Sequence, residues 1–388
     1  MVRQPALPTH ATCLLFVGPS RRPCFVVERC RVPFEELGNS EVLIRVRLAG
    51  LCHADARRFV HAPGGAADFT DALIPGHEAV GDVVASQRPG VDVGARVVFS
   101  AFNWCMECDC CRQGAHVACE NATKYGGQPP WALGGTLSSH VLLRGGTAVC
   151  AVPPAVPDAR ALLAACPLAA AIAGVRRLLL LLPGRVEGGT AGQRGDDGGR
   201  PAPPPTALVQ DCGGGLVGIL ACAVLAESGF MVFCEGGDVS RLRLAAKFRA
   251  NPVFKDAGPL TPSATLPDRL DVVVMAFGVD GAGSPRTAGP HARLRAGGCL
   301  LLLGQPPPGG GSGTTLEAGA ILAKGLSVIG NSEYEPDNLQ DAVQFLEATG
   351  GKFPYDELLS PVYGMTDFQS ALASALDGKF LRVVVRPS

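Results

Sequence analysis

The sequence predicts an α/β protein with two domains, one rich in irregular strands and one built on a doubly wound parallel sheet. Its 388 residues are enough for two substantial hydrophobic cores. Residues from about 10 to 165 hold short runs of alternating apolar and polar side chains, clearest at 42–48, as half-buried strands do. From residue 206 onward, apolar strands alternate with helical segments, which indicates a parallel sheet covered by helices.

The elements of the second domain follow from its apolar runs. We expect strands at 207–209, 231–234, 270–276 and 299–303, and a helix over 219–226 directly after the first strand. After residue 330 the sequence predicts a helix at about 337–348 and a last strand at 383–385. We therefore assign 168–330 to the parallel-sheet domain, and 1–167 with 331–388 to the strand-rich domain.

One segment, 184–205, has the sequence GRVEGGTAGQRGDDGGRPAPPP. It is too poor in apolar residues to bury a core, so we interpret it as a disordered surface insert. A functional lid is the alternative, although inserts of this composition are usually tolerated at surface loops.

Composition narrows the class of protein. The formal net charge of −1, with neither a basic stripe nor an acidic tail, argues against a nucleic-acid or membrane-surface partner. The first residues lack the apolar run of a secretory signal. The 15 cysteines are therefore expected to be reduced, in a cytoplasmic setting where thiols can bind metal.

A compact cysteine cluster is the most specific motif. Four cysteines follow the spacing C-x2-C-x2-C-x7-C within a lobe at about 103–120, and they are Cys105, Cys108, Cys111 and Cys119. Four thiolates in so short a loop favour a closed, structural zinc site. An iron–sulfur cluster and disulfides are the alternatives, but ferredoxin spacings differ and nothing else indicates an oxidising compartment.

A glycine motif opens the second domain. Gly213, Gly215 and Gly218 form G-x-G-x-x-G between a predicted strand and a predicted helix, a context that favours binding of a dinucleotide pyrophosphate. A plain glycine-rich turn is the alternative. Glu235, at the end of the next strand, is expected to bind the ribose of NAD and to repel the phosphate of NADP. If Gly236 holds the discriminating position instead, Arg241 or Arg243 would meet a 2′-phosphate, so NADP stays open.

A second metal site is indicated in the strand-rich domain. Cys52, His77 and Cys166 make a three-ligand set that leaves one zinc position for water or substrate. Each residue alone has a structural explanation, since buried cysteines and single histidines are common in cores.

The chain resembles the zinc-dependent medium-chain alcohol dehydrogenases over nearly its whole length. The resemblance is carried by GLCHAD (50–55), PGHEAVG (75–81), the cysteine lobe and DCGGGLVG (211–218), in that order. It implies a catalytic domain of the GroES-like fold, a Rossmann coenzyme domain, two zinc ions per chain and NAD. It also implies hydride transfer between the cofactor and a small alcohol or its carbonyl product.

The resemblance also implies roles for matching residues. Cys52, His77 and Cys166 would bind the catalytic zinc, with Cys166 the least secure because polyol-type relatives often carry glutamate there. Asp55 would orient His77, Glu78 would lie near the zinc, and His53 would contact the cofactor pyrophosphate. The four lobe cysteines would hold the structural zinc. Relatives assemble as dimers or tetramers, so a homodimer or homotetramer is expected.

One position departs from the family pattern. The family usually has Ser or Thr two residues after the first zinc ligand, where it relays the alcohol proton, and this chain has Ala54. A non-catalytic zinc- and nucleotide-binding protein is therefore the alternative function. A zinc-free reductase of the same fold is disfavoured by the cysteine lobe. Residues 124–127 and 333–362 resemble the subgroup associated with phosphonate metabolism, which suggests a hydroxy-phosphonate or a polyol as substrate.

Overall fold

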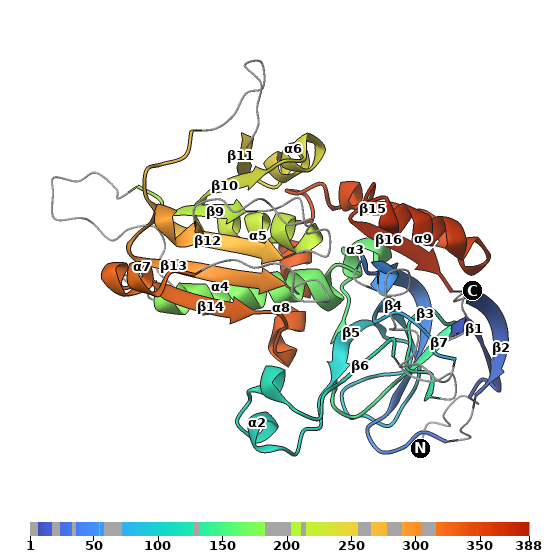
Figure 1. Ribbon diagram of the computed structural model, residues 1–388. Helices are drawn as coiled ribbons and strands as arrows, with labels where there is room; N and C mark the ends of the chain where they lie inside the picture. The colour runs from blue at the N-terminus through green and yellow to red at the C-terminus, as the bar shows by residue number, and fades with distance from the viewer. Residues whose placement is uncertain are drawn as a thin grey trace. The chain divides into compact units, whose positions relative to one another are not determined.

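The computed structural model describes residues 7–17, 24–32, 36–53, 55–57, 72–127, 132–182, 203–210, 215–254, 265–277, 289–304 and 316–387. The chain divides into two compact units, Met1–Ala169 with Glu335–Ser388, and Ala170–Tyr334 (Figure 1). The α/β fold class predicted from the sequence is confirmed. The functional assignment of the predicted domains stays a prediction, and most of the predicted insert lies outside the described residues.

The first unit is built on a curled sheet of eight strands. In its main path the order is β15 (Leu359–Gly364), β16 (Arg382–Arg386), β3 (Val42–Leu51), β4 (Glu78–Ser86), β5 (Arg96–Asn103) and β6 (Thr123–Lys124). Two further strands leave this path: β7 (His140–Leu143) pairs with β3, and β8 (Thr147–Ala151) pairs with β5. A separate antiparallel pair joins β1 (His10–Val17) to β2 (Cys24–Arg31).

Strand β3 is half-buried in its first part and fully buried in its last part. Arg45 and Arg47 point to solvent between buried neighbours, as the alternation predicted, and both reach Asp82 on β4 at 3.0 and 2.7 Å. From Leu48 onward every residue of β3 is buried. The strand therefore delivers its carboxyl end, and the residues that follow it, into the interior.

Short helices complete the first unit. They are α2 (Asp109–Arg112), η1 (His116–Ala118), α3 (Asp158–Ala161), the π-helical turn η3 (Ala164–Leu168), α8 (Pro336–Thr349), η6 (Tyr355–Leu358), η7 (Met365–Asp367) and α9 (Phe368–Leu376). The helix predicted at 337–348 and the strand predicted at 383–385 are confirmed by α8 and β16.

The second unit contains a parallel sheet of six strands. Their order is β11 (Ala250–Phe254), β10 (Met231–Gly236), β9 (Thr206–Gln210), β12 (Leu270–Phe277), β13 (Leu294–Gly304) and β14 (Ser327–Asn331). In chain order this is 3-2-1-4-5-6, the arrangement of a doubly wound nucleotide-binding sheet. The four predicted strands lie within β9, β10, β12 and β13; β11 and β14 had no clear apolar run and were missed.

Helices of the second unit are α4 (Ala169–Leu181), α5 (Leu216–Glu227), α6 (Val239–Lys247), the 3-10 turn η5 (Pro290–Arg293) and α7 (Ala318–Lys324). Helix α5 confirms the helix predicted at 219–226, and nearly all of its residues are buried because it is apolar on every side. Strand order reverses beside β9, so the carboxyl end of β9 and the start of α5 form the place where such sheets bind ligands.

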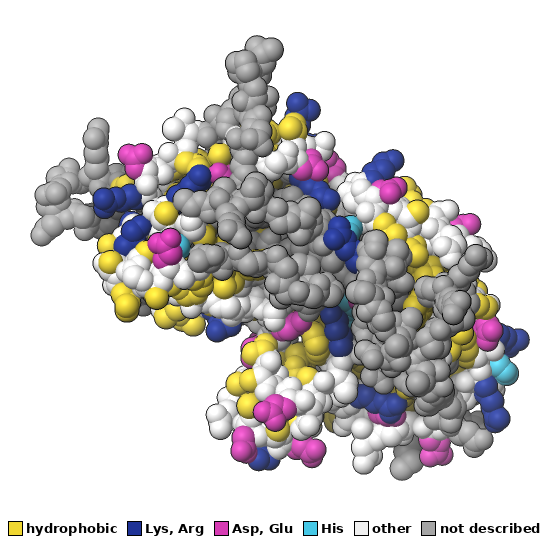
Figure 2. All heavy atoms as spheres, viewed as in Figure 1, with side chains coloured by type: hydrophobic (Ala, Val, Ile, Leu, Met, Phe, Trp, Pro, Cys, Tyr) yellow, Lys and Arg dark blue, Asp and Glu magenta, His cyan; other side chains and the backbone are white. Residues whose placement is uncertain are grey.

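Two features of the structure concern a membrane and charged partners. The helical stretch Asp158–Leu181 is long and apolar enough to span a membrane by composition, but 78% of its most apolar window is buried inside the protein, as in a core helix. On the face drawn in Figure 2, basic and acidic side chains are interspersed rather than gathered by sign.

Candidate functional site

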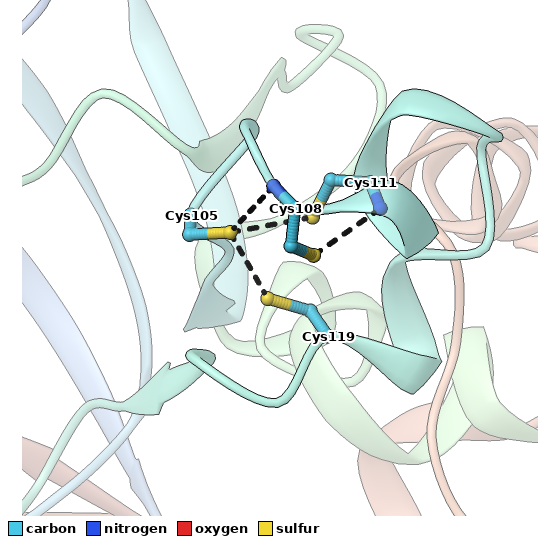
Figure 3. Close-up of side chains that lie close together, drawn as sticks. All are labelled: Cys105, Cys108, Cys111 and Cys119. Atoms are coloured by element: carbon cyan, nitrogen blue, oxygen red, sulfur yellow. Dashed lines mark hydrogen bonds between the residues drawn. The ribbon is translucent and has the colours of Figure 1, made fainter.

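The four predicted lobe cysteines lie together in the first unit. Their ligand atoms are all within 4.8 Å of one another, and Figure 3 shows the four sulfurs turned toward a common centre. Cys105 Sγ lies 3.9 Å from Cys111 Sγ and 3.5 Å from Cys119 Sγ. The short turns α2 and η1 bring the cysteines together, because one turn places residues three apart on the same side.

Backbone amides of the lobe favour thiolate. The amide of Cys108 donates to Cys105 Sγ at 3.3 Å, and the amide of Cys111 donates to Cys108 Sγ at 3.5 Å. Hydrogen bonds from the amides of Glu107 and Cys108 lower the pKa of Cys105 to about 6. Burial raises the pKa of Cys111 to about 12. The amide donors thus favour the thiolate form of Cys105, which metal binding requires.

A glutamate that the sequence analysis missed anchors this lobe. Glu335 Oε2 accepts hydrogen bonds from the His116 amide at 2.9 Å and, at 3.0 Å, pairs with His116 Nδ1, while Oε1 accepts from the Val117 amide at 3.3 Å. The same residue caps helix α8, with Asn338 completing the capping box. Glu335 therefore ties the cysteine lobe to α8.

The second cluster gathers around the carboxyl end of β3 and the start of β4. Cys52 follows β3 directly, His77 directly precedes β4, and Glu78, the first residue of β4, pairs with Gly50 of β3. Ligand atoms of Cys52, His77 and Glu78 lie within 4.8 Å of one another. His77 and Glu78 are 1% and 0% exposed, so this is an interior site.

Cys166 reaches the same cluster from the π-helical turn η3. Pro167 has no amide hydrogen, and the Leu168 amide instead bonds the Leu163 carbonyl at 3.0 Å, which widens the turn. Burial raises the pKa of the Cys166 thiol to about 11, although the neighbouring His77 favours the thiolate. The structure thus places Cys166 close enough to interact with His77 and Cys52, while the ligand atoms within 4.8 Å of one another are those of Cys52, His77 and Glu78.

Asp55 orients the imidazole of His77. Its Oδ2 lies 2.8 Å from His77 Nδ1, which leaves Nε2 facing the Glu78 carboxylate at 3.6 Å. Burial would lower the pKa of His77, but the Asp55 carboxylate outweighs burial and the charge of Lys124, and the pKa lies well above its ordinary value. His53 is half-buried beside the cluster, and Ala54 lies outside the described residues.

A buried arginine completes the cluster, and the sequence analysis missed it. Arg382, on β16, is 4% exposed and places Nε 3.1 Å from Glu78 Oε2. Burial would raise the pKa of Cys52, but the Arg382 charge and the His77 contact hold it below its ordinary value. The only signal for this residue was a basic side chain within an apolar terminal strand.

Of the residues predicted to bind the nucleotide, His53 lies in the first unit, and Gly215, Gly218, Glu235 and Arg241 lie in the second, while Gly213 is outside the described residues. Gly215 precedes α5 with φ at +128°, and a Cβ there would meet no described atom within 4 Å. Gly218 is buried in the first turn of α5. The N-cap residue of this helix, Gly215, supplies no side-chain cap, and an uncapped helix start is what binding of a pyrophosphate uses.

Glu235 and Arg241 both have partners among the described residues. Glu235 is 4% exposed and accepts a hydrogen bond from Gln210 Nε2 at 2.8 Å, while Arg293 contacts its other oxygen at 3.0 Å. Arg241 lies in the first turn of α6 and places Nε 3.6 Å from Asp238 Oδ2.

Comparisons with known proteins agree with this architecture. The sequence model of the alcohol dehydrogenase GroES-like domain matches residues 38–154. D-arabinitol dehydrogenase 1 of Uromyces fabae is 26% identical over 98% of this chain and 99% of its own length. Erythritol/L-threitol dehydrogenase of Mycolicibacterium smegmatis is 28% identical over 91% of each chain.

Solved structures share the fold over the whole chain. An alcohol dehydrogenase of Thermotoga maritima superposes with a TM-score of 0.74 at 17% identity, covering 97% of this chain and 99% of its own. Acetophenone reductase of Geotrichum candidum, in complex with NAD, superposes with a TM-score of 0.69 at 19% identity, covering 98% of each.

Proposed function

We propose that the chain is a zinc-dependent medium-chain alcohol dehydrogenase, which moves a hydride between a small alcohol, or its carbonyl product, and a nicotinamide dinucleotide. The observation that carries this proposal is the cluster of Cys52, His77 and Glu78, whose ligand atoms lie within 4.8 Å of one another, with Asp55 Oδ2 2.8 Å from the His77 imidazole and Cys166 close to His77. Two sulfurs and one imidazole leave a zinc ion one position for substrate.

The residues of this cluster fit a zinc ion. Asp55 holds Nδ1 of His77, which reserves Nε2 as a metal ligand, a pairing typical of zinc-bound histidines. The lowered pKa of Cys52 favours the thiolate that metal binding requires. A zinc ion held there supplies Lewis acidity that polarises an alcohol or carbonyl oxygen.

The lobe cysteines fit a second, closed zinc ion. Four sulfurs around one centre, with amide donors to two of them, leave no protein-free position for a substrate. We assign this ion a structural role, because the lobe has only a small apolar core around Trp104 to hold it folded.

Neighbouring side chains set the charge of the reaction site. Arg382 neutralises the buried Glu78 carboxylate and favours the thiolate form of Cys52. Glu78, with one oxygen 3.6 Å from His77 Nε2, lies where it can contact the metal position. Proton release is routed through His53 or water, since position 54 carries no hydroxyl.

A polyol or a hydroxy-phosphonate is the substrate class that we propose. Relatives named for D-arabinitol and erythritol oxidation favour a polyol. Lys124 carries a positive charge close to His77 and therefore favours a polar or anionic substrate. The loop that follows Lys124 packs Gly126 against the backbone of Gly76, the residue before His77. The Lys124 charge is also close enough to act on the pKa of His77.

Metal content and turnover together test the proposal. We expect about two zinc ions per chain and nicotinamide reduction with at least one alcohol in a panel of alcohols, polyols and hydroxy-phosphonates. Cys52→Ser should abolish turnover while the protein stays folded, and Cys110→Ser is the matched control that should change nothing. Full activity of Cys52→Ser would contradict the site assignment.

A substitution at position 54 distinguishes the enzyme from the non-catalytic alternative. Ala54→Ser restores the hydroxyl that relatives use to relay the proton, so a higher rate with unchanged nucleotide affinity is expected. Nucleotide binding with no turnover in either protein, across the full panel, would favour the non-catalytic reading.

A further inference from the structure

We infer that Glu335 is a positioning residue that couples the cysteine lobe to Cys166, so that metal bound in the lobe strengthens metal binding at the interior cluster. This inference rests on the proposed function, because it concerns the two metal sites of that function. All the elements involved belong to the first unit, whose second segment begins at Glu335.

The coupling starts with the contact between Glu335 and η1. Three contacts of the carboxylate fall on η1: the amides of His116 and Val117, at 2.9 and 3.3 Å, and His116 Nδ1 at 3.0 Å. Cys119 is the C-cap of η1, and its amide donates to the His116 carbonyl at 2.9 Å. Since Cys119 is one of the four lobe cysteines, metal bound to them restrains the amides that Glu335 contacts.

The lobe has little other packing to keep η1 in place. The ring of Trp104 packs edge-on against His116, with the ring centroids 5.7 Å apart. Among the described residues, the buried cluster of the lobe consists of Trp104, Cys111 and Cys119. Two of these three are lobe cysteines, so the order of η1 depends on the metal that they bind.

Helix α8 connects the lobe to the rest of the unit. Glu335 is its N-cap, so the residue that contacts η1 also fixes the start of the helix. One face of α8 is buried at Leu339, Ala342, Val343 and Leu346, the three- and four-residue spacing of a helix packed on a core. The helix packs against β5, β8, α3 and η3. Because packed interiors are nearly incompressible, a shift of its first turn is passed on to these neighbours.

The coupling ends at η3, the turn that carries Cys166. Directly after the last residue of α8, the Gly350 carbonyl accepts a hydrogen bond from Arg160 on α3 at 3.0 Å. Helix α3 is the element that precedes η3 in the chain, so α8 is anchored close to this turn. Pro167 supplies no amide within η3, and the position of Cys166 therefore depends on packing from outside the turn.

The expected size of the coupling follows from the precision that a metal ligand needs. A site loses function when its ligands move by about 0.5 Å or more. Two coupled sites usually change each other's affinity by about 5- to 150-fold. Because Glu335 acts through a helix and a turn, we expect a value near the lower limit, about five- to tenfold, for zinc at the interior cluster.

Glu335→Asp tests the contact with η1 without removing the helix cap. Aspartate is a favoured N-cap residue and keeps the negative charge at the start of α8, so the urea midpoint should stay unchanged. Its side chain is shorter by one C–C bond, about 1.5 Å, which takes the carboxylate out of hydrogen-bond range of η1. Zinc affinity at the interior cluster should therefore fall about five- to tenfold.

Competition with a chelator measures this affinity, and the ion that is lost in Cys52→Ser identifies the interior site. Glu347→Asp is the matched control. It makes the same change at an exposed position near the other end of α8, and it should leave the interior affinity unchanged.

A double-mutant cycle separates coupling from a local effect on the helix. Cys108→Ser, which empties the lobe, should lower the interior zinc affinity about five- to tenfold in the unaltered chain. In the Glu335→Asp background the same substitution should have no further effect, because the connection is already broken. Since coupling is reciprocal, Cys52→Ser should lower the zinc affinity of the lobe by the same factor.

The outcomes separate this inference from the function on which it rests. Unchanged interior affinity in Glu335→Asp overturns the inference, and so does an equal loss in Glu347→Asp. An equal effect of Cys108→Ser in both backgrounds means that the lobe acts without Glu335, which also overturns it. Two bound zinc ions without coupling leave the dehydrogenase proposal intact, whereas a chain with no zinc at the interior cluster refutes both.

Discussion

Arg382→Met is the substitution that examines the buried cluster most directly. It removes the guanidinium but keeps an apolar side chain of similar length on β16. Glu78 is 0% exposed, and Arg382 Nε, at 3.1 Å, is its ion-pair partner in the structure. Breaking a buried pair by removing one member typically costs about 3–5 kcal/mol, because the other charge stays buried without compensation. That is a large share of the roughly 5–15 kcal/mol that stabilises a typical domain.

Urea unfolding followed by tryptophan fluorescence measures this loss. Trp104 is buried in the first unit, so its fluorescence reports on the unit that holds the cluster. Glu78→Gln on its own and the double variant Glu78→Gln/Arg382→Met complete a thermodynamic cycle. The double variant should be more stable than Arg382→Met, since it buries no unpaired charge.

The reasoning would be wrong if Arg382→Met lost less than about 1 kcal/mol, the value of an exposed ion pair. It would also be wrong if the two substitutions were additive, because residues that share a buried ion pair must couple. A parallel measurement of nucleotide-fragment binding, which depends on the second unit, serves as the control for global misfolding.

Three other substitutions test separate parts of the structure. Cys108→Ser should release about one zinc ion per chain and lower the melting temperature, whereas equal zinc content would disprove the closed lobe site. Asp55→Asn should weaken zinc binding at the interior cluster by about ten- to hundredfold, measured by competition with a chelator; unchanged affinity would remove its orienting role. Asp271 is half-buried, and burial would raise its pKa, but Thr206 and Arg295 hold it below 3.8. Its stabilisation is therefore present above about pH 4 and lost as the pH falls through the lower folded pKa, so Asp271→Asn should destabilise the protein at pH 7 and flatten its acid unfolding curve.

Local patterns made part of this structure predictable. The lobe cysteines lie within fifteen residues, so their spacing alone restricts how they can meet. The strands β9, β10, β12 and β13 are apolar on both faces and are followed by turn residues. Each can therefore be recognised in the sequence as one apolar run. The resemblance to a known family supplied the pairing of Cys52 with His77, which spacing could not.

Contacts that join distant parts of the chain were not predictable in this way. Glu335 reaches His116 across 219 residues, and Arg382 reaches the Leu51 carbonyl across 331. Both depend on how β16, β3 and α8 pack, and no periodicity in either segment encodes that. Glu235 shows the opposite problem, since its position at the end of a strand suggested a ligand while its register with Gln210 engages it internally.

The charges of the interior cluster predict how zinc retention responds to two substitutions. A zinc ion carries two positive charges, which the thiolates of Cys52 and Cys166 cancel, and a neutral His77 adds none. Glu78 then remains as a fully buried negative charge, so Arg382 is required whether or not metal is bound. Removing Arg382 weakens the preference of Cys52 for thiolate, whereas neutralising Glu78 does not. Zinc retained after dialysis against a chelator should therefore fall in Arg382→Met and persist in Glu78→Gln. The reverse order would mean that Glu78 is itself a main ligand and that Arg382 serves only to place it.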